Sequence, residues 1–115
     1  MYKKIFTLCL ALSVMTFSAV AETLKVGNKT ISVSSSQSSI TPTGLSKGTI
    51  KWDASSKTLT FKNVEMNSTQ YNAVEFDGYS INLKFEGKNV IKSKYFDFKI
   101  KVSSYCTISC SNAYL

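Results

Sequence analysis

The chain of 115 residues contains no histidine and no arginine, and each absence excludes a class of site. Histidine is the commonest general base and metal ligand near neutral pH, so histidine-ligated zinc sites, Ser-His-Asp triads and Cys-His pairs are excluded. Arginine supplies the planar fork that holds phosphate or guanine through two hydrogen bonds. Lysine therefore provides all of the positive side-chain charge, and a net charge of +7 attracts polyanions only loosely. We expect no nucleic-acid partner.

The N-terminal segment, 1–21, has the pattern of a secretory signal peptide. Lys3 and Lys4 precede an uncharged, mostly apolar run over residues 5–20, and Ala19-Val20-Ala21 supplies the small residues that a signal peptidase reads. The run is shorter than the ~20 apolar residues that a membrane-spanning helix needs. We predict cleavage of the Ala21–Glu22 bond and a mature protein that is secreted, periplasmic or on the cell surface, and not embedded in a membrane.

After this segment, apolar and polar residues alternate with the period of two that β-strands impose. Continuous apolar runs, typical of a parallel sheet covered by helices, are absent. The mature chain is therefore predicted to be all-β with one buried layer, as a sandwich, a barrel or a solenoid. The residues expected to point into one core are Leu59, Phe61, Ile81, Leu83, Phe85, Phe96, Phe98, Ile100 and Val102.

Turn signals divide the mature chain into three parts. Residues 22–33 hold Gly27-Asn28-Lys29 between two short alternating stretches, which predicts a small N-terminal β-hairpin. Residues 34–48 contain the only proline and a serine-rich tract, so a loop is expected there. Residues 49–115 contain the other strands, with a turn at Asp77-Gly78.

Several short motifs follow one another between residues 24 and 91: a hairpin, a loop, Gly-Thr-x-x-aromatic-Asp, a polar turn, Thr-Leu-Thr-x-x-Asn, and a leucine followed by Gly-x-Asn-x-Ile. The residues in these motifs are Gly48, Thr49, Trp52, Asp53, Thr58, Leu59, Thr60, Asn63, Leu83, Gly87, Asn89 and Ile91. This pattern resembles a family of exported bacterial proteins commonly labelled carbohydrate-binding-domain-containing. The resemblance implies a short right-handed parallel β-solenoid with Asn89 at a corner, and a binding role. A small antiparallel β-sandwich is the alternative fold.

Two spacings bear on a solenoid. Leu59 and Phe61 recur as Ile81 and Leu83 at a spacing of 22 residues, about one coil. Members of the family continue through more coils than the three expected here, so 49–115 is interpreted as a solenoid-like domain that is incomplete relative to them.

Two cysteines, Cys106 and Cys110, lie in the last alternating segment. In an extended strand their Cα atoms are roughly 13 Å apart at ~3.3 Å per residue, beyond the ~7 Å that a disulfide tolerates. We predict two small buried thiols, and a bridge is the alternative.

We predict a secreted, non-catalytic surface or binding module with carbohydrate as the candidate ligand, because aromatic rings stack on the apolar faces of sugars. The candidate ligand-binding residues are Trp52, Asp53, Tyr71, Asn72, Asp77 and Tyr79. Trp52 lies in a predicted strand and is equally suited to the core. The carboxylates that could form a glycosidase pair, but that no pattern places face to face, are Glu65, Glu75, Asp77 and Glu86. No catalytic residue, metal or cofactor is therefore predicted.

Three alternatives for function and association stay open. For function, the alternatives to a binding module are a polysaccharide-active enzyme and a truncated fragment with no activity of its own. Residues 96–115 have no proline and no helical pattern to cover a last strand, which predicts either self-association through this segment or marginal stability of the isolated mature domain.

Overall fold

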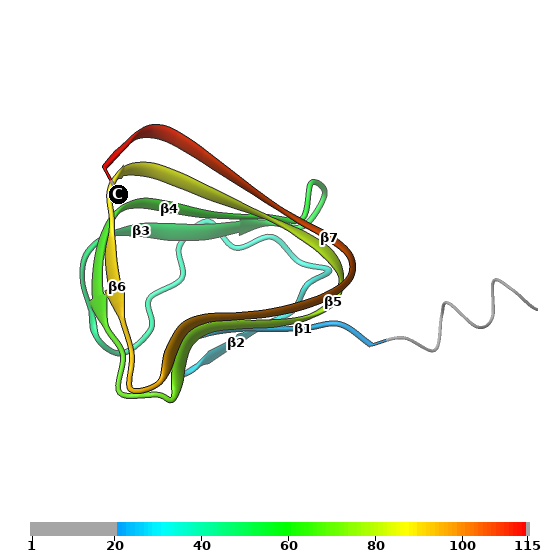
Figure 1. Cartoon of the computed structure of the whole chain (residues 1–115), viewed down its shortest axis with the longest axis horizontal. Coiled ribbons are helices and arrows are strands. Elements are labelled where there is room, and N and C mark those ends of the chain that lie inside the picture. Colours follow the sequence, from blue (N-terminus) through cyan, green and yellow to red (C-terminus); the bar gives the residue numbers. More distant parts are fainter. Residues whose placement is uncertain (1–20, 115) are drawn as a thin grey trace, which may run out of the picture.

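The computed structural model describes residues 21–114, so the predicted signal peptide lies outside the described residues except for Ala21. Within them, β-strands form one curled mixed sheet, which confirms the all-β prediction (Figure 1). None of the described residues belongs to a helix long and apolar enough to cross a membrane. The strands are β1 (Thr23–Val26), β2 (Lys29–Ile31), β3 (Leu45–Asp53), β4 (Thr58–Asn67), β5 (Asn72–Lys88), β6 (Val90–Lys92) and β7 (Phe96–Tyr114).

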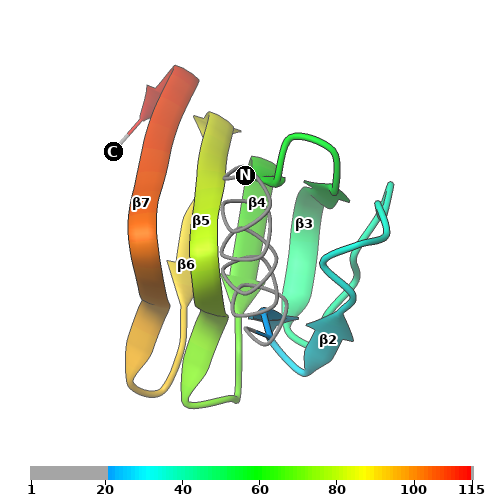
Figure 2. The same ribbon diagram turned by 90° about the vertical axis from the view of Figure 1, so that its right-hand side faces the viewer.

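The sheet has the order β2-β1-β5-β4-β3, with β6 beside β4 and β7 beside β5. β4 pairs in parallel with β5 and β6, and β5 pairs in parallel with β7. Antiparallel pairing involves the N-terminal strands: β1 with β2 and β5, and β3 with β4. Figure 1 shows that the chain traces a roughly three-sided outline, and Figure 2 shows β7, β5, β4 and β3 side by side.

Parallel strands pair at a nearly constant offset along the sequence. Leu59 is opposite Leu83 and Phe61 is opposite Phe85. Val74 is opposite Phe98 at the same offset, which then lengthens slightly at the two register shifts between β5 and β7. The expected spacing, which matched Leu59 with Ile81, is therefore wrong. The observed register stacks the rings of Phe61 and Phe85, with centroids 5.2 Å apart and planes 13° from parallel.

The hydrophobic core lies inside the curl. The buried apolar side chains are Leu24, Val26, Ile31, Ile40, Ile50, Trp52, Leu59, Phe61, Val64, Met66, Ala73, Val74, Phe76, Ile81 and Leu83. The predicted core residues Phe85, Phe98, Ile100 and Val102 pack against this cluster but are only partly buried. Phe96 is 50 % exposed, which corrects its assignment to the core. β7 pairs with β5 alone, so no further strand in the described sheet lies beyond its outer edge to cover this ring.

One predicted boundary, the end of the serine-rich loop, differs from the structure. β1 and β2 form the expected hairpin at Gly27-Asn28, but β3 begins at Leu45, inside the segment expected to be a loop. Its first residues pair with β4 through two register shifts, and Gly48 has a φ of +89°. A Cβ at Gly48 would overlap the backbone of Asn63, so glycine lets β3 continue where a side chain would stop it.

The Asp77-Gly78 signal marks a bend and not a turn between strands. β5 runs without interruption from Asn72 to Lys88, and its register with β7 shifts between Gly78 and Ser80. Pairing continues on both sides of the shift, so the strand changes direction while its backbone stays hydrogen-bonded.

The serine-rich loop closes the N-terminal end of the curl, and Figure 1 shows it passing across the outline. Gln37 exchanges two backbone hydrogen bonds of 2.9 Å with Trp52, and the Ile40 N–H donates to the Ile50 carbonyl at 2.8 Å. The Ile40 side chain is buried at 3 % exposure. The loop therefore covers both the free edge of β3 and one end of the core.

Candidate functional site

Trp52 is a core residue. Its side chain is 1 % exposed, and its indole N–H donates to the Val33 carbonyl at 3.2 Å. It alternates inward with Ile50 on β3, where the serine-rich loop lies across it. A buried ring offers no platform to a sugar, so Trp52 is withdrawn as a contact residue.

Asp53, the next candidate, lines an open polar hollow of ≈ 740 Å³ on the outer face of the sheet. The predicted polar turn is confirmed, because the Asp53 carboxylate accepts hydrogen bonds from the Ser55 hydroxyl at 2.8 Å and the Ser55 N–H at 3.1 Å. These hydrogen bonds lower the pKa of Asp53. The residues that line the hollow are Ser36, Gln37, Ser38, Lys51, Trp52, Asp53, Ser56, Thr58, Thr60, Lys84 and Glu86.

The polar hollow is balanced in charge. Lys51 and Lys84 line it together with Asp53 and Glu86, and Lys84 Nζ lies 3.2 Å from Glu86 Oε2. Thr60 is the most buried polar residue of the lining, at 8 % exposure. Hydroxyl, amide, ammonium and carboxylate groups therefore converge without an excess of either sign, which suits a neutral hydroxyl-rich ligand better than a polyanion.

Tyr71 belongs to a group of exposed rings that we call the aromatic corner, made of Tyr71, Tyr95 and Phe96. Their exposed fractions are 69 %, 68 % and 50 %. The ring centroids of Tyr71 and Tyr95 are 5.6 Å apart, and those of Tyr95 and Phe96 are 4.6 Å apart. Three large exposed rings in contact form the kind of apolar surface that marks an interaction site.

Backbone hydrogen bonds hold the aromatic corner in place. The Tyr71 carbonyl accepts the N–H groups of Tyr95 at 2.8 Å and of Phe96 at 3.1 Å, and the Gln70 carbonyl accepts that of Lys94 at 3.1 Å. Sequence reasoning identified Tyr71 and missed Tyr95 and Phe96. The signal that could have found Tyr95 is its offset from Tyr71, which equals the offset between paired residues of β5 and β7 such as Val74 and Phe98.

Asn72 does not accompany Tyr71 at the surface. It is buried at 8 % exposure, and its side-chain Nδ2 donates to Glu75 Oε2 at 2.8 Å. Its Oδ1 has no hydrogen-bond partner among the described residues. Asn72 therefore supports the start of β5, and its role as an exposed contact is corrected.

Asp77 and Tyr79 lie at the other end of the same strand segment. Tyr79 is 57 % exposed, and Asp77 is also exposed. Asp77 is six residues from Tyr71 and Tyr79 is eight, which correspond to roughly 20 Å and 26 Å of extended strand at ~3.3 Å per residue. The structure therefore does not bring all the predicted contacts into one site.

Three of the four carboxylates considered as a glycosidase pair take separate partners. Glu65 lies 3.8 Å from Lys47, Glu75 accepts from Asn72, and Glu86 lies beside Lys84. Between residues 21 and 114, no cluster of three Cys, Asp or Glu side chains could hold a metal ion.

The described residues thus present two candidate binding surfaces, the aromatic corner and the polar hollow, at different places on the sheet. Comparisons of the chain with protein-family models, with curated proteins and with solved structures each find no match. The function is therefore inferred from the chemistry of these two surfaces.

Proposed function

We propose that this chain is a secreted, non-catalytic surface module that binds carbohydrate at the aromatic corner. The observation that carries the proposal is the pair Tyr71 and Tyr95, whose exposed rings lie 5.6 Å apart at an angle of 33°. A sugar ring has an apolar C–H face and a rim of hydroxyl groups, and it stacks on such rings while its hydroxyls stay hydrated.

Backbone hydrogen bonds hold together the two turns that carry these rings before a ligand arrives. Tyrosine has few side-chain rotamers to lose on binding, and the Tyr71 carbonyl ties the backbones of both turns together through Tyr95 and Phe96. A preordered site loses little conformational entropy on binding. The platform is nevertheless small and open, so we expect an affinity of about −4 to −6 kcal/mol, millimolar to high micromolar.

The fold proposed for the module is a right-handed parallel β-solenoid whose coil length is the offset between Leu59 and its partner Leu83. The parallel pairs of β4 with β5 and β6, and of β5 with β7, support it. So does Asn89, which accepts from the Val64 N–H at 2.8 Å and donates to the Glu86 carbonyl at 3.1 Å, as a corner residue would. The right-handed sense is expected because crossover connections between parallel strands are almost always right-handed.

The test is a glycan array followed by calorimetry on the best ligand. Tyr71→Ala and Tyr95→Ala should each weaken binding about tenfold, since each removes one face of the platform. Tyr79→Ala removes another exposed tyrosine, at the far end of the segment; it is the matched control and should leave affinity unchanged.

Other outcomes discriminate between the alternatives. Loss of binding in Lys84→Ala with no effect of Tyr71→Ala would move the site to the polar hollow. Failure of the folded protein to bind any neutral or acidic glycan would overturn the binding function. Turnover of a polysaccharide that disappears in Glu75→Gln or Glu86→Gln would overturn the non-catalytic assignment.

A further inference from the structure

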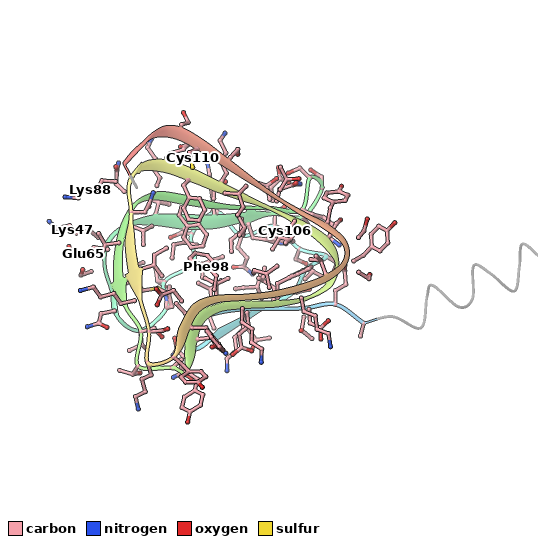
Figure 3. The ribbon with its side chains drawn as sticks, viewed as in Figure 1. Lys47, Glu65, Lys88, Phe98, Cys106 and Cys110 are labelled. Carbon is pink, nitrogen blue, oxygen red and sulfur yellow. The ribbon has the colours of Figure 1, made fainter. Side chains whose placement is uncertain are left out.

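The outer edge of β7 is unpaired in the described sheet. β7 is hydrogen-bonded to β5 along one side, which leaves the N–H and C=O groups of its other side open. Its inward row of Phe98, Ile100, Val102 and Cys106 is only partly buried, and Ile108 is 63 % exposed. Figure 3 labels Phe98, Cys106 and Cys110 along this strand, with Phe98 toward the inside of the outline. An apolar row beside an open backbone edge is a surface built for another strand.

The two ends of the sheet are not alike. At the N-terminal end the serine-rich loop pairs with β3 and buries Ile40 and Trp52. A copy that stacked the whole of its open β7 edge on this end would have to displace the loop from β3, although the outer edge of β2 is unpaired in the described sheet. Head-to-tail growth is therefore disfavoured, and an open edge is best matched by the same edge of another molecule.

We propose that two copies of this chain associate through β7 about a two-fold axis at its bend. A register shift opposite Gly78 and Ser80 divides β7 into two halves, 96–102 and 105–111. An axis through this bend places each half of one copy antiparallel to the other half of the second copy. Both halves are then covered at once.

The side chains select this axis over the alternative. With Ser104 on the axis, inward residues meet inward residues: Ile100 faces Ile108 of the second copy, and Val102 faces its Cys106. On the outward face, Lys99 is opposite Ser109 of the second copy and Lys101 is opposite its Thr107. A two-fold axis through the middle of 96–102 would instead set Lys99 against itself, and like charges directly opposite are destabilising. The interface is isologous and closes at two copies.

The first test is the oligomeric state in solution of the exported chain, which is predicted to begin at Glu22. We expect a dimer by light scattering and sedimentation at about 100 µM. Ile108→Asp places a charge on the apolar row, and it should weaken the dimer at least about tenfold; Ile108 is exposed in the single copy, so this variant should still fold. Thr107→Asp is the matched control on the outward face, where it meets Lys101 of the second copy, and it should keep the dimer or tighten it. A monomeric wild-type chain, open-ended polymers, or equal loss in both variants would overturn the proposal.

The second test reads the register. Val102→Cys should cross-link to the native Cys106 of the second copy under mild oxidation, giving a covalent dimer on a non-reducing gel. Lys101→Cys, one residue away on the outward face, should not. Cross-linking from Lys101→Cys as efficient as from Val102→Cys would contradict the arrangement. Neither test depends on carbohydrate binding.

Discussion

Asn63 and Gly87 meet at one corner of the curl, where both have a positive φ, 52° and 75°. A Cβ on Gly87 would overlap Asn63 Oδ1, and this oxygen accepts the Lys88 N–H at 3.2 Å. Glycine and asparagine are the residues that adopt the left-handed region with least strain. The two motifs that hold these residues, Thr-Leu-Thr-x-x-Asn and Gly-x-Asn, therefore build the same corner from adjacent strands.

Gly87→Ala should lower the free energy of unfolding by about 1–3 kcal/mol. Alanine would add backbone strain at a positive φ and would displace the Asn63 side chain from its hydrogen bond. Denaturant unfolding measures the change. Thr69→Ala, in the exposed turn between β4 and β5, should stay within about 0.5 kcal/mol. Equal stability of the two variants would contradict the role of this corner.

Phe98→Ala should cost about 1–3 kcal/mol of stability, less than the ~3–5 kcal/mol of a fully buried aromatic ring. The Phe98 ring packs edge-on against Phe61 at 5.6 Å and Phe85 at 5.8 Å, but its outer side is open. Phe96→Ala removes a half-exposed ring and should cost under about 1 kcal/mol. Thermal melts of the two variants separate the effects, and the reverse order would sink the assignment of Phe98 to the core side.

Glu22 should contribute stability that disappears in acid. Burial raises the pKa of Glu22, but hydrogen bonds from Lys57 Nζ at 2.6 Å and the Tyr79 N–H at 2.8 Å outweigh it and hold the pKa below the ordinary 4.5. A depressed pKa means that the stabilisation is complete above that ordinary value and is lost as the pH falls through the folded value. Glu22→Gln should therefore cost about 1–2 kcal/mol near pH 7.

The pH profile distinguishes this effect from general destabilisation. Between about pH 5 and pH 3, the stability of Glu22→Gln should fall less steeply than that of the wild type. Glu65→Gln is the control, since Glu65 is exposed and lies 3.8 Å from Lys47. Parallel profiles for wild type and Glu22→Gln would show that Glu22 does not titrate as described.

The two thiols should differ in reactivity. Both cysteines are free, but Cys106 is partly buried and Cys110 is exposed, so the prediction of two buried thiols is wrong for Cys110. Burial raises the pKa of Cys106 and reduces its thiolate fraction. Cys110 should react with a maleimide about tenfold faster, as followed by intact mass. The measurement belongs at a protein concentration at which the chain is monomeric, because the proposed dimer would cover both thiols.

Export should yield a chain that begins at Glu22. The pattern of segment 1–21 predicts this cleavage, and intact mass of the exported protein measures it. Ala21→Phe should block processing, because signal peptidases require a small residue at this position. Exported material that retains 1–21 would refute the signal peptide.

The sequence by itself determined the all-β class and most of the inward-facing residues. Alternation with a period of two is a local property of the strand, and it identified Leu59, Phe61 and Leu83 as core without knowledge of their neighbours. The Asp53 turn was predictable for the same reason, because its hydrogen bonds reach only two residues along the chain.

Only the tertiary structure decided which strands meet and which aromatic rings remain exposed. The register of β4 against β5 stacks Phe61 on Phe85, two residues that no local pattern connects. Trp52 is buried because the serine-rich loop folds over it, and Tyr71 gains Tyr95 as a neighbour because two turns stack through backbone hydrogen bonds. Burial and contact are properties of what packs around a side chain, so they follow from the three-dimensional arrangement and not from the residue and its immediate neighbours in the chain.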